Sequence, residues 1–198
     1  MGVDIVEGNG NLDMFFVSKT CHYLTDNRLL RKKTDVKEYS TQLDTINIDE
    51  YALKLKAILK DPVRSELYKD RINLFQKIID KCEFASKDIE ITHFFGFRFI
   101  ARDEFNSKIS LNALSSGEKH MIIQLYELLF EAQDGTLVLI DEPELSLHMM
   151  WQMNYLKFLE EISKLRGYQC IVATHSPQIF NSMWSLTTDL FTISNSER

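Results

Sequence analysis

Cysteine, proline and glycine are scarce in this chain, and each shortage excludes a class of protein. The three cysteines, Cys21, Cys82 and Cys170, are odd in number, far apart and never part of a CxxC pair, which argues against a disulfide framework or a zinc site. Three prolines and seven glycines leave no stretch with the composition of a linker. No apolar run approaches the roughly 20 residues needed to cross a bilayer, and residues 1–11 do not resemble a signal peptide. We therefore expect a cytoplasmic protein that does not enter a membrane.

The overall composition is that of a folded, water-soluble domain. Hydrophobic residues make up 44% and charged residues 26% of the 198 residues, which is enough chain to bury a core without disulfides or metal. The net charge of −6 gives no overall attraction to nucleic acid, and the densest basic stretch is Arg28, Arg31, Lys32, Lys33 and Lys37. Because this stretch has no interleaved aromatic residues, a solvated loop is favoured, and DNA binding is the alternative.

Hydrophobic spacing predicts an α/β domain with a helical insertion. The first half of the chain holds a strand at 14–24 and two helices at 49–60 and 64–82 that are broken at Asp61-Pro62. Residues 88–102, with a turn at Phe95-Gly96, form two short strands or a hairpin. An amphipathic helix at 117–133 is followed by strands at 136–140, 169–173 and 190–194 and by helices at 148–166 and 178–183. The apolar run at 136–140 is typical of a central strand buried on both faces. We expect a mainly parallel sheet flanked by helices.

Two carboxylates follow the predicted central strand, in the order Ile140-Asp141-Glu142-Pro143. The carboxyl edge of an open α/β sheet is where ligands bind. A strand that simply ends in polar residues is one interpretation. The other is chemical, because Mg²⁺ prefers carboxylate oxygens and a phosphate-cleaving site needs a carboxylate to orient or deprotonate water.

Two further segments have both a structural and a functional interpretation. Ser115 and Glu118 have the spacing of a capping box, but Ser115-Ser116-Gly117 at a helix start also offers bare N–H groups to an anion. His175 follows the strand at 169–173, where it is either a satisfied core residue or a hydrogen-bond donor that senses a terminal phosphate.

These segments occur in the order LSSGEKH, LVLIDEPELSLH and IVATHSPQIF. The set resembles the signature motif, the Walker B motif with its D-loop, and the H-loop of ABC-type ATPases. DEPELSLH and ATHSP are most similar to the branch that includes RecF, SMC-like proteins and OLD-family ATPases. The resemblance covers about the last ninety residues. It implies the C-terminal part of a P-loop NTPase fold, with ATP and Mg²⁺ as cofactors.

The resemblance also implies a role for each motif. Asp141 would hold Mg²⁺ through water, Glu142 would be the general base for the attacking water, and His175 would contact the γ-phosphate. The signature would contact the γ-phosphate of a nucleotide held by another subunit, and the D-loop would touch that subunit. The signature residues are Ser115, Ser116, Gly117 and Glu118, and the D-loop residues are Glu144, Leu145 and Ser146.

The family pattern fails at one point, because no GxxxxGK[ST] segment, the Walker A motif, occurs in the 198 residues. Gly8 and Gly10 lack the lysine and hydroxyl residue that should follow, and Gln42 and Gln76 are both candidates for the Q-loop glutamine. Without a Walker A motif, we expect this chain alone to bind ATP poorly and to be inactive. Either the motif lies upstream in the gene, or the site is completed by a Walker A-bearing partner. The expected assembly is a homodimer or a pair with such a partner.

We interpret the chain as a single partial ATPase domain. Residues 1–45 would be a remnant of the first lobe, 46–87 a helical insertion, and 88–198 the region of the signature, Walker B, D-loop and H-loop. The leading hypothesis is a segment of an ATPase that dimerises around ATP, in DNA maintenance or phage defence. The alternative is a non-catalytic interaction module that keeps the fold without turnover.

Overall fold

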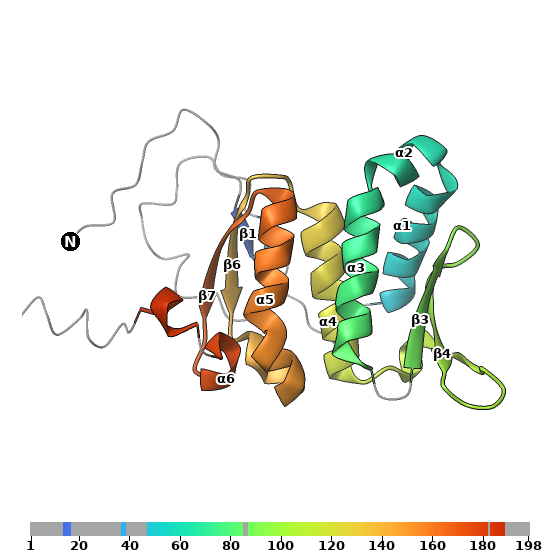
Figure 1. Ribbon diagram of the computed structural model, residues 1–198. Helices are drawn as coiled ribbons and strands as arrows, with labels where there is room; N and C mark the ends of the chain where they lie inside the picture. Colours follow the sequence, from blue (N-terminus) through green and yellow to red (C-terminus); the bar gives the residue numbers. More distant parts are fainter. Residues whose placement is uncertain (1–13, 17–36, 39–46, 85–86, 182, 189–198) are drawn as a thin grey trace, which may run out of the picture.

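The computed structural model of the chain describes residues 14–16, 37–38, 47–84, 87–181 and 183–188, and it packs helices between two sheets (Figure 1). One sheet is parallel, in the order β2-β1-β6-β7, and the other is antiparallel, in the order β3-β4-β5. The strands are β1 Met14–Phe16, β2 Lys37–Glu38, β3 Lys87–Thr92, β4 Gly96–Ala101, β5 Lys108–Ile109, β6 Leu137–Asp141 and β7 Gln169–Ala173. The predicted α/β class, with a parallel sheet flanked by helices, is confirmed.

The helices between the sheets come from both halves of the described chain. The α-helices are α1 Ile48–Lys60, α2 Pro62–Leu67, α3 Lys69–Cys82, α4 Ser116–Tyr126, α5 Met149–Arg166 and α6 Pro177–Phe180. Short turns of 3-10 helix are η3 Leu111–Ala113, η5 Pro143–Ser146 and η6 Trp184–Leu186, and η4 Glu127–Glu131 is a π-helix that continues α4. The division of the chain into lobe, insertion and motif region remains a prediction.

The predicted helical stretch before the hairpin is confirmed, with one extra break. Asp61 ends α1, and its carboxylate caps α2 by accepting hydrogen bonds from the N–H groups of Val63 and Arg64. Pro62 occupies the first turn of α2, where its missing N–H group costs nothing. The predicted single helix at 64–82 is wrong in detail, because the chain divides again at Tyr68 into α2 and α3.

The predicted hairpin at 88–102 is confirmed as β3 and β4, with β5 added to its edge. The turn residues lie at 93–95, so Gly96 begins β4 and pairs with Thr92 instead of forming the turn. Gly96 has a φ of +81°, and its Cα faces the backbone of α1, where an added Cβ would lie 1.8 Å from the carbonyl oxygen of Ala52. A glycine here allows α1 to lie directly on the hairpin.

The predicted amphipathic helix at 117–133 is a buried helix instead. All nine residues from Met121 to Leu129 are buried, so no polar face is presented to water. Helix α1, helix α3 and helix α5 surround it, and aromatic rings fill the space between them, with Phe75 packed edge-on against Tyr126 and Phe130. The spacing of apolar residues in the sequence could not reveal this burial, because whether a helix is covered on every side depends on which other elements pack against it.

The predicted strands at 136–140 and 169–173 are β6 and β7. Within the described sheet β6 lies between β1 and β7, so its central position is confirmed. Its alternate residues Val138 and Ile140 are buried, and Ile171 on β7 is 58% exposed. The long helices lie on one face of this sheet (Figure 1), and the β6 residues of the other face are only partly buried, so burial of β6 on both faces stays a prediction. The predicted strand at 190–194 and most of that at 14–24 fall outside the described residues.

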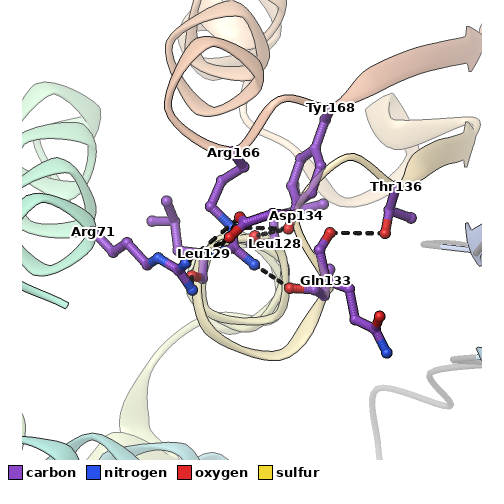
Figure 2. A network of polar contacts seen from close by, with 9 residues as sticks. Arg71, Leu128, Leu129, Gln133, Asp134, Thr136, Arg166 and Tyr168 are labelled. Atoms are coloured by element: carbon purple, nitrogen blue, oxygen red, sulfur yellow. Dashed lines mark hydrogen bonds and ion pairs between the residues drawn. The ribbon is translucent and has the colours of Figure 1, made fainter. Parts of the chain in front are cut away.

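A buried arginine ties the end of η4 to the start of β7 (Figure 2). Arg166 donates hydrogen bonds from Nε to the Tyr168 hydroxyl, at 3.0 Å, and from a guanidinium NH₂ group to the Ala132 carbonyl. Its other NH₂ group lies 2.6 Å from an Asp134 carboxylate oxygen, and the Tyr168 hydroxyl donates to the Leu128 carbonyl at 2.8 Å. These bonds satisfy carbonyls that the helix end leaves without intrahelical partners.

Arg71 and Thr136 add further contacts to the network around Arg166. Arg71 on α3 lies 3.1 Å from the Asp134 carboxylate and donates a longer hydrogen bond to the Leu129 carbonyl. Thr136 Oγ1 donates to the Gln133 carbonyl at 2.7 Å and so shapes the turn that leads into β6 (Figure 2). The network fixes the amino end of the central strand.

Glu127, at the start of η4, is a buried carboxyl group whose protonation should affect stability. Its Oε1 accepts a hydrogen bond from the Tyr51 hydroxyl at 2.9 Å, and Glu131 and Lys54 are its charged neighbours. Burial raises the pKa of the Glu127 carboxyl to about 7, with Glu131 acting in the same direction and the Tyr51 hydrogen bond and Lys54 opposing it. The folded protein therefore holds this proton at pH values where the unfolded chain releases it.

We predict that this proton makes the protein less stable as the pH rises from about 4.5 to about 7. The contribution is fully present below the unfolded pKa and is lost as the pH passes the raised folded pKa. Glu127→Gln cannot ionise, so from pH 4.5 to pH 8 it should lose about 3 kcal/mol less of its free energy of unfolding than wild type. Urea unfolding followed by circular dichroism at both pH values measures this difference. Glu160→Gln, at an exposed carboxylate paired with Lys164, is the control, and identical pH profiles for Glu127→Gln and wild type would refute the prediction.

Candidate functional site

The carboxyl ends of β6 and β7 form the edge at which the sequence predicts a site. The two strands are parallel and in register, with Asp141 opposite Ala173 and the Glu142 N–H donating to the Ala173 carbonyl at 2.8 Å. Asp141, Glu142 and the loop that begins with Thr174 therefore leave the sheet side by side. The first turn of α4 lies at the same end of the molecule (Figure 1). Chain segments far apart in sequence are thus gathered at one edge.

Glu142 has an unusual backbone conformation. Its φ is +45° and its ψ is +53°, the left-handed region that a residue with a side chain rarely adopts. Pro143 follows, and a residue before proline is normally extended, which makes this conformation more unfavourable. Strained residues of this kind persist where surrounding structure holds them, and they cluster at active sites. Glu83 and Asn106 also have a positive φ, so the strain supports Glu142 as a functional candidate together with its place beside His175 at the edge of the sheet.

His175 faces Glu142 across this edge. Its Nε2 lies 3.7 Å from Glu142 Oε1, a distance at which a protonated imidazole and the carboxylate form an ion pair. The His175 side chain is 90% exposed, so it is not the satisfied core histidine that was one interpretation of the sequence. An exposed imidazole beside a carboxylate can donate a hydrogen bond to a ligand that approaches from solvent.

The predicted capping box at the start of α4 is confirmed. The Glu118 N–H donates to Ser115 Oγ at 3.2 Å, and the Ser115 N–H donates to Glu118 Oε2 at 2.8 Å. Glu118 is buried and also forms a 2.6 Å ion pair with Lys87 of β3. Burial alone would raise the pKa of this carboxyl, but the hydrogen bonds from Lys87 and Ser115 lower it below its ordinary value. The Glu118 carboxylate is thus engaged in holding the turn.

The side chains at the start of α4 are more accessible than Glu118. Ser115 and Ser116 are exposed and Gly117 is half-buried, so an anion could reach the first turn from solvent. Lys119 points back to donate a hydrogen bond to the Asn112 carbonyl at 2.9 Å. The backbone geometry is compatible with the anion-binding interpretation, which remains a prediction.

The predicted D-loop is the turn η5, and its residues face different ways. Glu144 is half-buried and bonds to the loop after β7, whereas Leu145 is 72% exposed. Ser146 ends the turn. Leu145 is therefore exposed enough to meet a partner.

Sequence reasoning missed the residues that support this edge. Lys87 and Gln152 each bond to a motif segment, but neither carried a signal that distinguished it from an ordinary strand or helix residue, and Thr174, which lies within the ATHSP motif, was assigned no role of its own. Among the described residues no group of three or more histidine, cysteine, aspartate or glutamate side chains could hold a metal by itself. Mg²⁺ often takes only one or two protein carboxylates and completes its shell with water and phosphate, so a site with Asp141 as the protein ligand remains chemically suitable.

The fold and this edge define a class of protein, an α/β domain that gathers acidic and imidazole groups at the carboxyl ends of its strands, the edge where such sheets bind ligands. The chain belongs to the family described as "AAA domain, putative AbiEii toxin, Type IV TA system", which matches residues 23–181. The predicted resemblance to an AAA-type ATPase domain is therefore confirmed, and the RecF, SMC and OLD-like branch agrees with it.

Curated relatives cover part of the chain. The Retron Ec83 probable ATPase of Escherichia coli is 29% identical over 149 residues, which are 65% of this chain and 27% of the relative. An uncharacterized ABC transporter ATP-binding protein of Methanocaldococcus jannaschii is 31% identical over 106 residues, 54% of this chain and 40% of the relative. The chain thus spans less than half the length of either relative.

A solved structure of the SmcHead bound to the C-winged helix domain of ScpA is also similar. It shares 17% sequence identity and a TM-score of 0.47, over 69% of this chain and 45% of that chain. In the described part of this chain no helix is both long and apolar enough to span a membrane.

Proposed function

We propose that this chain supplies the hydrolytic half of an ATPase site, in an assembly that closes around ATP and reopens after hydrolysis. The observation that supports this most directly is Glu142, a strained carboxylate at the carboxyl end of β6 with His175 3.7 Å away. The family match and the position of the edge agree with it. The output of the ATPase would be DNA maintenance or phage defence.

Each residue of the edge has a proposed task. Asp141 would hold Mg²⁺ through water, and the ion would neutralise charge that develops on the phosphates. Glu142 would accept a proton from the attacking water at its carboxylate. His175 would donate a hydrogen bond to the terminal phosphate and orient it.

The signature and the D-loop would act across a subunit interface. Ser116 and Gly117 would direct their backbone N–H groups and the positive end of the α4 dipole at a phosphate held by the partner, and Ser115, whose N–H is bonded to Glu118, would contact it through its hydroxyl. Leu145, which is largely exposed, would contact that partner. In such a head-to-tail arrangement each site takes its phosphate grip from one polypeptide and its signature and D-loop from the other.

Phosphate release from Mg·ATP tests the proposal. We expect little release from this chain alone and about tenfold more or greater when a Walker A-bearing polypeptide is added, because the phosphate grip and the general base are then combined. The same polypeptide without this chain is the control. The proposal would be contradicted if phosphate release did not rise with any Walker A-bearing polypeptide encoded by the same gene or a neighbouring gene.

The alternative is an interaction module that keeps the fold without turnover. The missing Walker A motif favours it, whereas the strained Glu142 opposes it, because a scaffold has no need to hold a carboxylate in an unfavourable conformation. Binding of the partner with no phosphate release and no dependence on ATP would support the module.

A further inference from the structure

Glu144 joins the turn after β6 to the loop after β7. Its Oε2 accepts a hydrogen bond from Thr174 Oγ1 at 2.7 Å, and its Oε1 accepts one from the His175 backbone N–H at 2.8 Å. Hydrogen bonds to an ionised carboxylate at these distances are among the stronger ones in proteins. One side chain therefore holds two consecutive residues of the neighbouring loop.

The imidazole of His175 takes its position from its backbone. Its side chain is 90% exposed, so packing does not fix where it lies, yet its Nε2 is 3.7 Å from Glu142 Oε1. An exposed imidazole ring can lie only within one side-chain length of its Cα, so the position of the backbone limits where the ring can be. The bond from the His175 N–H to Glu144 therefore determines which groups the imidazole can face.

Further hydrogen bonds close the link around Glu144. The Ser176 N–H donates to Thr174 Oγ1 at 3.0 Å, and Ser176 Oγ lies 2.8 Å from Gln152 Oε1. Gln152 Nε2 in turn donates to the Leu147 carbonyl at 3.0 Å, at the end of the η5 turn. The loop after β7 is thus connected to both ends of the η5 turn, once through Glu144 and once through α5.

We propose that Glu144 is a positioning residue that holds the His175 peptide and thereby sets the separation of His175 from Glu142. The catalytic meaning of this role rests on the proposed ATPase function, whereas the hydrogen bonds of Glu144 join residues of this chain only. The role differs from the partner contact that the sequence suggests for Glu144, because its carboxylate is committed within the chain. Leu145, the next residue of the turn, is exposed.

Exchange of the His175 amide proton with water, measured by NMR on ¹⁵N-labelled chain without nucleotide, tests this role. Glu144→Ala removes both acceptor oxygens and should speed the exchange about tenfold or more. Glu144→Asp keeps the charge but is too short to reach both groups, so it should also speed the exchange. Glu144→Gln keeps an acceptor for the His175 N–H and can donate to Thr174, so its exchange should stay within about threefold of wild type.

Controls separate positioning from loss of fold and from the proposed function. Glu160→Ala removes an exposed carboxylate of α5 and should leave the His175 exchange unchanged. Thermal melting shows whether each variant folds. If Glu144→Ala does not fold, the exchange measured in Glu144→Asp decides the test. Unchanged His175 exchange in folded Glu144→Ala or Glu144→Asp would overturn the proposal. If exchange of the His175 amide proton is altered but no mixture releases phosphate, the positioning role of Glu144 is supported and the proposed ATPase function is contradicted.

Discussion

Glu142→Gln should reduce phosphate release about 100-fold or more in a mixture of this chain with a Walker A-bearing polypeptide, while ATP binding is retained. Glutamine has nearly the shape of glutamate, so it can occupy the same strained position beside His175. It cannot accept a proton from water at neutral pH, which removes the proposed general base. Single-turnover phosphate release and equilibrium binding of a fluorescent ATP analogue measure the two effects separately.

The matched control for this variant is Glu160→Gln, the same change at an exposed site that pairs only with Lys164 among the ion pairs of the described chain. Its phosphate release should equal that of wild type. Turnover retained by Glu142→Gln would remove Glu142 as the base and would return the site to the structural interpretation of a strand that ends in polar residues. Loss of ATP binding in Glu142→Gln would instead indicate that the carboxylate holds the fold of the site.

Gly96→Ala should destabilise the fold by about 3–5 kcal/mol, a large part of the 5–15 kcal/mol that stabilises a typical domain. The added Cβ would lie 1.8 Å from the Ala52 carbonyl oxygen and 2.8 Å from the Ala52 carbonyl carbon, so α1 would have to move off the hairpin. The positive φ of +81° adds strain for any residue with a side chain. Urea unfolding followed by circular dichroism measures the loss.

Gly135→Ala separates the clash from the backbone strain. Gly135 has a similar φ of +78°, but a Cβ there would meet nothing within 4 Å. Its substitution should cost about 1 kcal/mol, the strain alone. If the two variants lost equal stability, the close approach of α1 to β4 would not exist in solution.

The parts of this fold that the sequence predicts are those determined by neighbouring residues. Asp61 and Pro62 mark the end of one helix and the start of the next, and Ser115 and Glu118 cap α4, because in each case the interacting groups lie within three residues of one another. The apolar run of β6 is likewise a local signal, and it placed Asp141 and Glu142 at the edge of the sheet correctly.

The features that sequence reasoning missed depend on partners far along the chain. Glu118 pairs with Lys87, 31 residues away, and Glu144 bonds to Thr174, 30 residues away, so neither contact has a sequence pattern. The left-handed backbone of Glu142 also carries no signal, because glycine or asparagine is the usual marker of that conformation. Its cause is tertiary, since the Glu142 N–H bonds to the neighbouring strand.

The arginine network around Arg166 and the carboxylate of Glu142, the proposed general base, lie at opposite ends of β6, separated by a strand of five residues. Substitutions at the two ends should therefore have different consequences in a living cell. Changes at Arg166 or Tyr168 should lower the amount of protein that escapes proteolysis, because the fold opens more often. Changes at Glu142 or His175 should leave the amount of protein normal and abolish the biological effect. Inactive but abundant variants would then map to the carboxyl end of β6, and variants with little protein would map to its amino end.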